Sequence, residues 1–270
     1  MAGKIIYNAS FDSTTRVLSL LDKAGNVISS CEVPSKGLVD DITKPLTFRA
    51  TQDGSTVKLT KNGNPSGAFQ TSRDGGNTWV DYTLNTAITL NTGDEVSFRA
   101  KANRTSGHSS SVYFYFKMEG KIEAWHNVMS LYRTNDFATY ESTVSGAFVS
   151  QFASCRSLTK APVLPATKLS DYCYDCMFAN CQSLTKAPVL PATNLAERCY
   201  RSLFNGCRSL KEVRIAATTT ATDALIYWLQ GVSATGDFYC DPNATIFPTG
   251  TAGIPENWNR HALADYPITP

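Results

Sequence analysis

The chain has 270 residues, 42% of them hydrophobic, and carries 25 Lys and Arg against 23 Asp and Glu. This length predicts one large globular domain or two modest ones, and the net charge of +2 without a basic block argues against a nucleic-acid-binding protein. No apolar run reaches the roughly 18 to 20 residues that cross a bilayer, so we expect no membrane insertion. Only three His are present, which leaves few general bases or metal ligands, and we expect neither an enzyme nor a cofactor.

Residues 1–43 contain three stretches typical of β-strands, KIIYNASF, RVLSLLD and NVISSCEV. The segment PSKGLVDDITKP that follows has the composition of a linker. The start of the chain lacks the apolar core of a secretory signal. We therefore predict that residues 1–43 form an N-terminal β-hairpin arm that attaches the chain to an assembly.

Residues 44–120 predict an antiparallel β-domain, because stretches such as LTFRAT, STVKLTK, DEVSFRA and SVYFYFKM alternate apolar and polar residues between the turn signals NGN, DGG and NTGD. We expect a small antiparallel β-sandwich. One turn matches the Asp-box pattern S-x-D-x-G-x-T-W at Ser72, Asp74, Gly76, Thr78 and Trp79. In this pattern the Asp ties a hairpin turn, so we interpret it as a detail of the fold and not as a catalytic group.

An internal repeat dominates residues 121–220. Residues 155–180 and 181–206 share 16 of 26 positions, including the block SLTKAPVLPAT. A degenerate unit precedes them and a partial one follows, as is typical of stacked repeats with capping ends.

Each repeat has two halves with different patterns. SLTKAPVLP carries two prolines and predicts a short strand, whereas Leu169, Cys173, Met177 and Cys181 recur every four residues and predict a helix. One strand and one helix per 26 residues is the plan of a leucine-rich repeat. Ala221, Ala224, Leu225, Trp228 and Leu229 predict a further amphipathic helix at the start of a C-terminal capping segment, residues 221–270. The expected fold class is therefore α+β, mostly β on the N-terminal side: a small antiparallel β-sandwich, a short leucine-rich-repeat-like solenoid and a cap.

Five of the eight cysteines recur with the repeat period: Cys155, Cys181 and Cys207 in one column, and Cys173 and Cys199 in another. We interpret them as a structural ladder of small buried thiols, with disulfides and a metal site as the alternatives. Cys173 and Cys176 have the spacing of a redox pair or half a zinc site, but the second repeat has Ser202 in place of the second thiol. Asp237, Asp241 and Asn243 lack the spacing of a Ca²⁺ loop and predict a solvated turn.

The repeat block C-x-S-L-T-x-A-P-x-L-P-A-T-x-L-x-x-x-C-Y, the closing WLQGVSATGDFY and GIPENW, and PLTFRATQDG upstream resemble the BspA-type leucine-rich-repeat proteins of gut Bacteroidetes and of the phages that infect them. Crass-like phages are one such source. The resemblance covers about residues 44–258. It implies adhesion or receptor contact through a repeat surface and offers no catalytic residues to transfer.

Together these features predict a phage virion structural protein, as a capsid decoration, a head fibre or a tail-associated component, assembled in the host cytoplasm. We expect it to be a homo-oligomer, to bind other virion proteins through residues 1–43, and to contact a host-surface glycan or protein. The alternative is a secreted or cell-surface bacterial adhesin of the same type, although such adhesins begin with an export signal.

The polar edge of the repeats is the candidate contact surface. If Leu158 and Leu164 point inward, Thr159 and Lys160 are exposed and stack beside Thr185 and Lys186 of the next repeat, with Lys211 nearby. This arrangement predicts a flat, positively charged strip suited to an extended anionic glycan. Lysines on a repeat edge that serve only solubility are the alternative.

Overall fold

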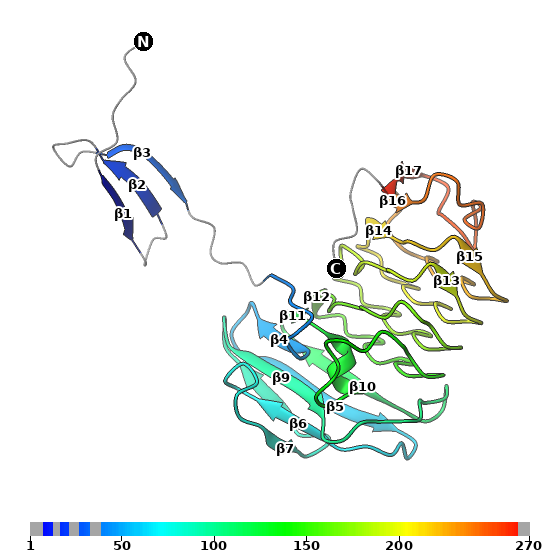
Figure 1. The fold of residues 1–270 in the computed structure, drawn as a ribbon, viewed down its shortest axis with the longest axis horizontal. Helices are drawn as coiled ribbons and strands as arrows, with labels where there is room; N and C mark the ends of the chain where they lie inside the picture. Colours follow the sequence, from blue (N-terminus) through cyan, green and yellow to red (C-terminus); the bar gives the residue numbers. More distant parts are fainter. Residues whose placement is uncertain (1–7, 13–16, 22–26, 33–38, 264–270) are drawn as a thin grey trace, which may run out of the picture. The chain divides into compact units, whose positions relative to one another are not determined.

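The computed structural model describes residues 8–12, 17–21, 27–32 and 39–263, and the chain divides into two compact units, Met1–Val39 and Asp40–Pro270. In the first unit, β1 (Asn8–Asp12), β2 (Val17–Leu21) and β3 (Val27–Glu32) form an antiparallel sheet in the order β1-β2-β3 (Figure 1). The sequence predicts a hairpin here, and the described strands form a three-stranded meander because β2 pairs on both sides. Residues 40–43 belong to the second unit.

The second unit begins with two sheets that pack face to face, which we call the two-sheet region (residues 44–125). Its strands are β4 (Thr47–Ala50), β5 (Ser55–Asn62), β6 (Phe69–Ser72), β7 (Val80–Tyr82), β8 (Ile88–Leu90), β9 (Glu95–Ala100), β10 (Tyr113–Glu119) and β11 (Ile122–Trp125). One sheet has the order β10-β5-β8 and the other the order β12-β11-β4-β9-β6-β7. Phe116 of the first sheet lies 4.7 Å from Phe48 and 5.2 Å from Phe98 of the second, ring centre to ring centre.

The larger sheet joins the two-sheet region to the repeats. β12 (Leu158–Lys160) belongs to the first repeat and pairs parallel with β11, which itself pairs antiparallel with β4. The chain between β11 and β12 starts with the one-turn 3-10 helix η1 (Val128–Leu131), where the Asn127 side chain accepts a hydrogen bond from the Met129 N–H at 2.8 Å. The sheet is therefore mixed.

The repeats consist of tight turns stacked on one another, which we call the stacked turns (residues 146–154, 172–180, 198–206 and 223–231). Along each stacked turn, one backbone N–H donates to a carbonyl of the next repeat and the following N–H donates to a carbonyl of its own turn. Tyr174 N–H donates to Cys199 O in the next repeat at 3.0 Å, and Asp175 N–H donates to Tyr172 O three residues back at 3.2 Å. A left-handed backbone recurs every four residues, at Gly146, Ser150, Ser154, Tyr172, Cys176, Asn180, Arg198, Ser202, Gly206, Asp223, Tyr227 and Gly231.

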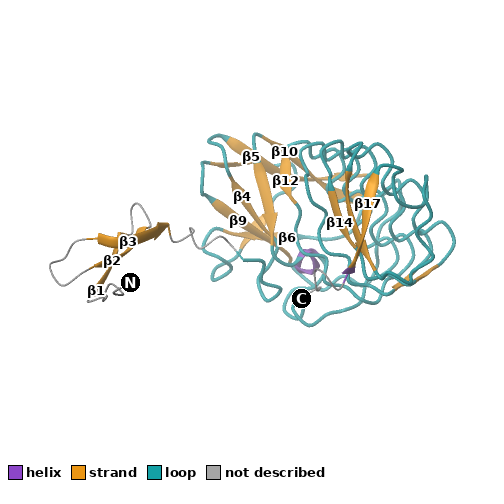
Figure 2. Ribbon diagram, turned by 90° about the horizontal axis from the view of Figure 1, so that it is seen from above, coloured by secondary structure: helices purple, strands orange, loops and turns teal. Residues whose placement is uncertain are grey.

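The expected α+β fold class is wrong. The described residues contain no α-helix and form a nearly all-β structure of several flat sheets, in which no leucine-rich-repeat-like solenoid is detected (Figure 2). The helix expected at Leu169 to Cys181 and the one expected from Ala221 are both stacked turns. The apolar residues that suggested a helix recur strictly every four positions because each turn is four residues long, whereas a helix has 3.6 residues per turn.

Outside the stacked turns, the repeats and the C-terminal segment carry short parallel strands in two separate sheets (Figure 1). They are β13 (Asn194–Leu195), β14 (Glu212–Arg214), β15 (Thr219–Thr220), β16 (Gly236–Cys240) and β17 (Trp258–Ala262). β13 pairs with β15, and β14, β16 and β17 form a three-stranded sheet in that order. In the first repeat, Pro162 of SLTKAPVLP follows β12 closely and limits its length, since a proline cannot donate to a ladder.

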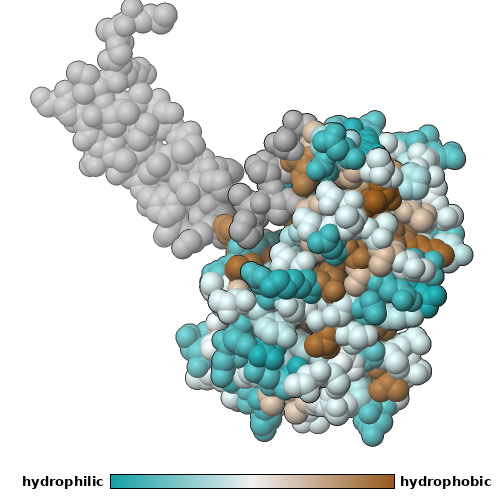
Figure 3. Space-filling model, turned by 45° about the vertical axis from the view of Figure 1, so that its right-hand side comes forward, coloured by the Kyte–Doolittle hydropathy of each residue, from teal (hydrophilic) through white to brown (hydrophobic). Residues whose placement is uncertain are grey.

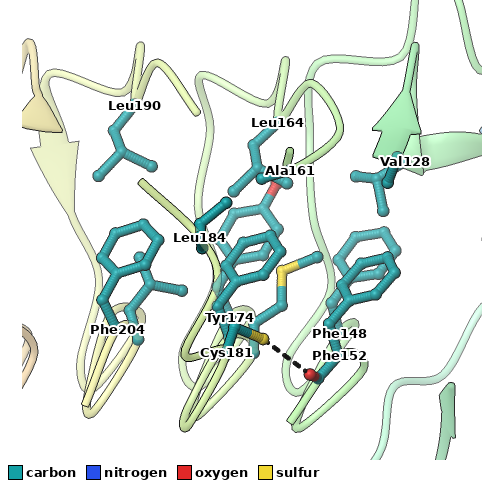
Figure 4. Close-up of a cluster of buried hydrophobic side chains, with 14 of the residues drawn as sticks. Val128, Phe148, Phe152, Ala161, Leu164, Tyr174, Cys181, Leu184, Leu190 and Phe204 are labelled. Atoms are coloured by element: carbon teal, nitrogen blue, oxygen red, sulfur yellow. Dashed lines mark hydrogen bonds between the residues drawn. The ribbon is translucent and has the colours of Figure 1, made fainter. Parts of the chain in front are cut away.

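One hydrophobic core runs from Leu46, just before β4, to Trp258 in β17. Its spine is a column of stacked rings, in which Phe116, Phe152, Phe178 and Phe204 follow one another at 5.4, 5.3 and 5.6 Å between ring centres (Figure 4). Phe148, Tyr174 and Tyr200 form a second column at 5.5 and 5.9 Å. Because Phe116 belongs to β10, the two-sheet region supplies the first ring of the column, and the second unit is a single packed body.

Replacement of Ser202 distinguishes the stacked turns from a helix. Ser202 has φ of 51°, where glycine is favoured over alanine by about 1 kcal/mol, whereas a helix interior favours alanine by about 1 kcal/mol. We expect Ser202→Gly to be more stable than Ser202→Ala in urea unfolding. The reverse order would mean that this segment is helical in solution.

Candidate functional site

The predicted contact surface lies along the row of short parallel strands. Pairing places Lys160 opposite Glu123, Lys186 opposite Glu212, and Glu212 opposite Asp237. The charges along this row therefore include both signs, and the strip that the sequence predicts as positively charged is interrupted by carboxylates. Figure 3, coloured by hydropathy, shows one side of the molecule, where hydrophilic residues are interspersed with apolar ones.

Lys160 is held in place on this row. Its Nζ lies 2.7 Å from the Asp40 carboxylate and 3.9 Å from the centre of the Trp125 ring. The side chain is 28% exposed. The expected exposure of Lys160 is thus not found, because the residues that open the second unit fold over it.

The other predicted contact residues differ in exposure. Thr159 is half-buried and donates its hydroxyl to Ile122 O at 3.1 Å, whereas Thr185 and Lys211 are exposed. Lys186 is exposed and its Nζ lies 3.0 Å from the Glu212 carboxylate. Thr185, Lys186 and Lys211 are the members of the set that solvent reaches freely.

The cysteines of the repeat form two buried columns. In one column the thiols of Cys155, Cys181 and Cys207 donate to the carbonyl oxygens of Phe116, Phe152 and Phe178 at 3.2, 3.1 and 3.0 Å (Figure 4). Cys173 and Cys199 are buried in the other, and the cysteines of residues 39–263 are all free thiols. Burial raises the pKa of Cys207 and of Cys199 to about 12, so both stay protonated at neutral pH.

The Asp-box turn between β6 and β7 is tied by Asp74. Its carboxylate accepts hydrogen bonds from the Ser72 hydroxyl at 2.6 Å and from the Thr78 N–H at 2.9 Å. These bonds hold the pKa of Asp74 well below its usual range. Trp79 closes the turn, since its indole N–H donates to Gly76 O at 2.9 Å.

A hollow of about 290 Å³ lies beside this turn. It is lined by Trp79 and Gly76 of the turn, by Lys44 and Pro45 before β4, by Arg99 of β9, and by residues 134, 135 and 137 after η1. No motif in the sequence indicates this hollow, because its lining comes from four segments far apart in the chain. The DGG signal indicated the turn alone.

Internal hydrogen bonds hold Asp237 of β16 and Asp241 and Asn243 of the turn that follows, which are the oxygen ligands considered for a Ca²⁺ loop. The Asp237 carboxylate lies 2.8 Å from the His261 ring, and Asp241 accepts from the Asn243 N–H at 2.8 Å. Across residues 39–263 and the described strands of the first unit, no three His, Cys, Asp or Glu side chains are grouped as a metal site. Nor does that part of the chain contain a helix with the length and apolar character needed to span a membrane.

Comparison with protein-family models, with curated proteins and with solved structures gave no match to the chain.

The buried thiols predict a loss of stability at alkaline pH. An unfolded cysteine ionises near pH 8.5, whereas Cys207 in the folded chain has a pKa of about 12, so its contribution is present below about pH 8.5 and is lost as pH rises toward about 12. Above about pH 9, each such thiol lowers the free energy of unfolding by about 1.4 kcal/mol for every pH unit. We expect Cys207→Ala and Cys207→Ser to remove that slope equally, as measured by urea unfolding from pH 7.5 to 10.5. If the free energy of unfolding of both variants fell with pH as steeply as that of the wild type, the raised pKa of Cys207 would be contradicted.

Proposed function

We propose that the chain is a virion structural protein that displays an adhesion module, with residues 1–43 attaching it to the particle and residues 44–270 facing a host surface. The repeat motif, which resembles that of BspA-type proteins, supports the adhesive role. The division into a small sheet and a large packed body supports separate tasks for the two parts. The other expected properties, a homo-oligomer and assembly with other virion proteins, are part of this proposal.

The observation that carries the proposal is that residues 40–43, the start of the second unit, are bonded to residues 126, 127 and 160 of the same unit. Asp40 accepts from Lys160 Nζ at 2.7 Å and from the His126 N–H at 3.1 Å. Asp41 N–H donates to the His126 ring at 3.1 Å, and the Asn127 side chain donates to Ile42 O at 2.9 Å. A partly buried ion pair with a cation–π contact resists displacement more than a solvated pair does. The chain therefore enters the second unit at a fixed point, as a display module requires of its attachment.

A bacterial cell-surface adhesin is the second candidate, favoured by the same repeat motif. The two differ in where the chain is found. Mass spectrometry of purified phage particles from the source would detect the chain if the virion proposal is correct, and its presence only in bacterial envelope fractions would favour the adhesin.

Removal of the first unit tests the division of tasks. We expect a chain that starts at Asp40 to unfold at a temperature within a few degrees of the full chain, because the core from Leu46 to Trp258 is untouched. The shortened chain should fail to join the particle, as measured by co-sedimentation. A chain that starts at Lys44 is the matched control: it lacks the bonds of residues 40–43 and should be less stable. If the Asp40 chain unfolds, or still joins the particle, the proposed role of the arm is wrong.

The exposed lysines test the contact row. We expect Lys186→Glu with Lys211→Glu to weaken attachment to host cells, more at low salt, because both side chains are exposed and a surface attraction is screened by ions. Lys160→Glu is unsuitable, since it places a carboxylate against Asp40. Lys117→Glu with Lys121→Glu, on the two-sheet region, is the matched control. If both double variants attached to host cells equally well, the contact surface would not include Lys186 and Lys211.

A further inference from the structure

We propose that the hollow beside the Asp-box turn is a binding site for a carboxylated monosaccharide unit, such as a uronic acid within a glycan. The site is formed by the two-sheet region together with residues 134, 135 and 137 after η1. Its test uses purified protein and does not depend on attachment to a particle or cell.

The size of the hollow favours a single sugar ring. Its volume of about 290 Å³ is just below the range for small-molecule sites, about 300 to 1,000 Å³. Its lining combines apolar surface from Trp79, Pro45 and Phe137 with polar side chains from Thr43, Thr134 and Asn135. A sugar ring has the same combination, with C–H faces that pack on apolar groups and hydroxyls that need donors and acceptors.

The positive charge of the lining favours a ligand with a carboxylate group. Two cations, Arg99 and Lys44, line the hollow, and the described lining residues include no Asp or Glu. Lys44 is exposed and forms no ion pair with a described residue. The neighbouring Asp41 carboxylate accepts hydrogen bonds from the N–H and hydroxyl of Thr43 at 2.9 and 2.6 Å, so it is bonded within its own turn. The two cations of the lining give the hollow a positive potential that attracts an anion.

Arg99 is oriented before any ligand arrives. Its Nε and one Nη donate to the Gln70 side-chain oxygen at 3.0 and 2.9 Å, and the guanidinium carbon lies 4.2 Å from the centre of the Trp79 ring. No hydrogen bond to a described residue uses the other Nη. That nitrogen is therefore a donor for a ligand carboxylate in a fixed guanidinium.

The turn itself is also fixed. Asp74 holds the turn through Ser72 and Thr78, and the Trp79 indole is bonded to Gly76 O. Gly76 has φ of 98°, a conformation that L-residues rarely adopt, and its backbone lies against Trp79 and Pro45, where a Cβ would be in contact at 3.5 and 3.7 Å. The surface is thus preformed, and little conformational entropy is lost in ordering it when a ligand binds.

The test is calorimetric titration of the full chain with D-glucuronate, D-glucose and acetate. We expect glucuronate to bind with a Kd of about 1 mM or tighter, and glucose and acetate to bind at least tenfold more weakly. Equal binding of glucose would refute the role of the cations, and equal binding of acetate would reduce the site to a simple carboxylate contact. Absence of glucuronate binding at several times that concentration would overturn the proposal.

Variants place the binding at the hollow. We expect Lys44→Gln to weaken glucuronate binding about threefold and Arg99→Gln at least tenfold, since Arg99 is the preoriented donor. Lys121→Gln is the matched control, because Lys121 is an exposed lysine of the same region at the opposite end of β4. Thermal unfolding checks that Arg99→Gln is folded, and Lys44→Gln keeps the test valid if it is not. Wild-type affinity in Lys44→Gln and Arg99→Gln, or an equal loss in Lys121→Gln, would show that glucuronate binds elsewhere.

Discussion

The alternation of backbone hydrogen bonds in the stacked turns is the constraint on which the second unit depends. Every second N–H bonds within its own turn, and the next one reaches the neighbouring repeat, as for Asp175 and Tyr174. A helix satisfies all of its interior N–H groups internally, so a helix could not be joined to its neighbour in this way. The stacked turns instead share their hydrogen bonds between neighbours. Each repeat therefore relies on the one beside it for half of its bonds as well as for its apolar contacts.

The side chains follow from this backbone. Repeats joined residue by residue bring identical positions together, which explains both the ring column through Phe152, Phe178 and Phe204 and the buried thiols beside it. Tightly packed interiors leave room for only a small group at the thiol positions, and each thiol in the first column also satisfies a carbonyl. The cysteines thus have a structural explanation that needs neither a disulfide nor a metal.

Periodicity in the sequence indicated the right segments but not always the right structure. Alternation of apolar residues in LTFRAT and STVKLTK indicates strands, and β4 and β5 lie there. The four-residue spacing from Leu169 to Cys181 gave the wrong answer, because helical residues and residues of tight four-residue turns produce similar patterns over three periods. The residues with positive φ include Tyr172, Cys176 and Arg198, which no propensity assigns to that conformation. Contacts between repeats override local preference at these positions.

The candidate sites also differ in how far the sequence predicts them, because some depend on local and others on distant contacts. The exposure of Lys186 and Lys211 is a property of one repeat edge and is within reach of sequence reasoning. The enclosure of Lys160 depends on Asp40, 120 residues away, and the hollow at Trp79 depends on four separate segments. Neither arrangement leaves a local signal in the sequence.

The ring column has an architectural consequence for the length of the protein. Its first member, Phe116, is fixed in a sheet, and its last member, Phe204, donates its N–H at 2.9 Å to the carbonyl of Trp228, which packs in a ring cluster with Phe238 and Phe247. Between these dissimilar ends, one 26-residue repeat presents to its neighbours the same bonding groups and the same rings as the next. Duplication or loss of a whole repeat would leave the backbone bonding pattern and the ring columns continuous without any change at either end. Such a chain can change its reach in discrete steps during evolution while its two ends stay the same.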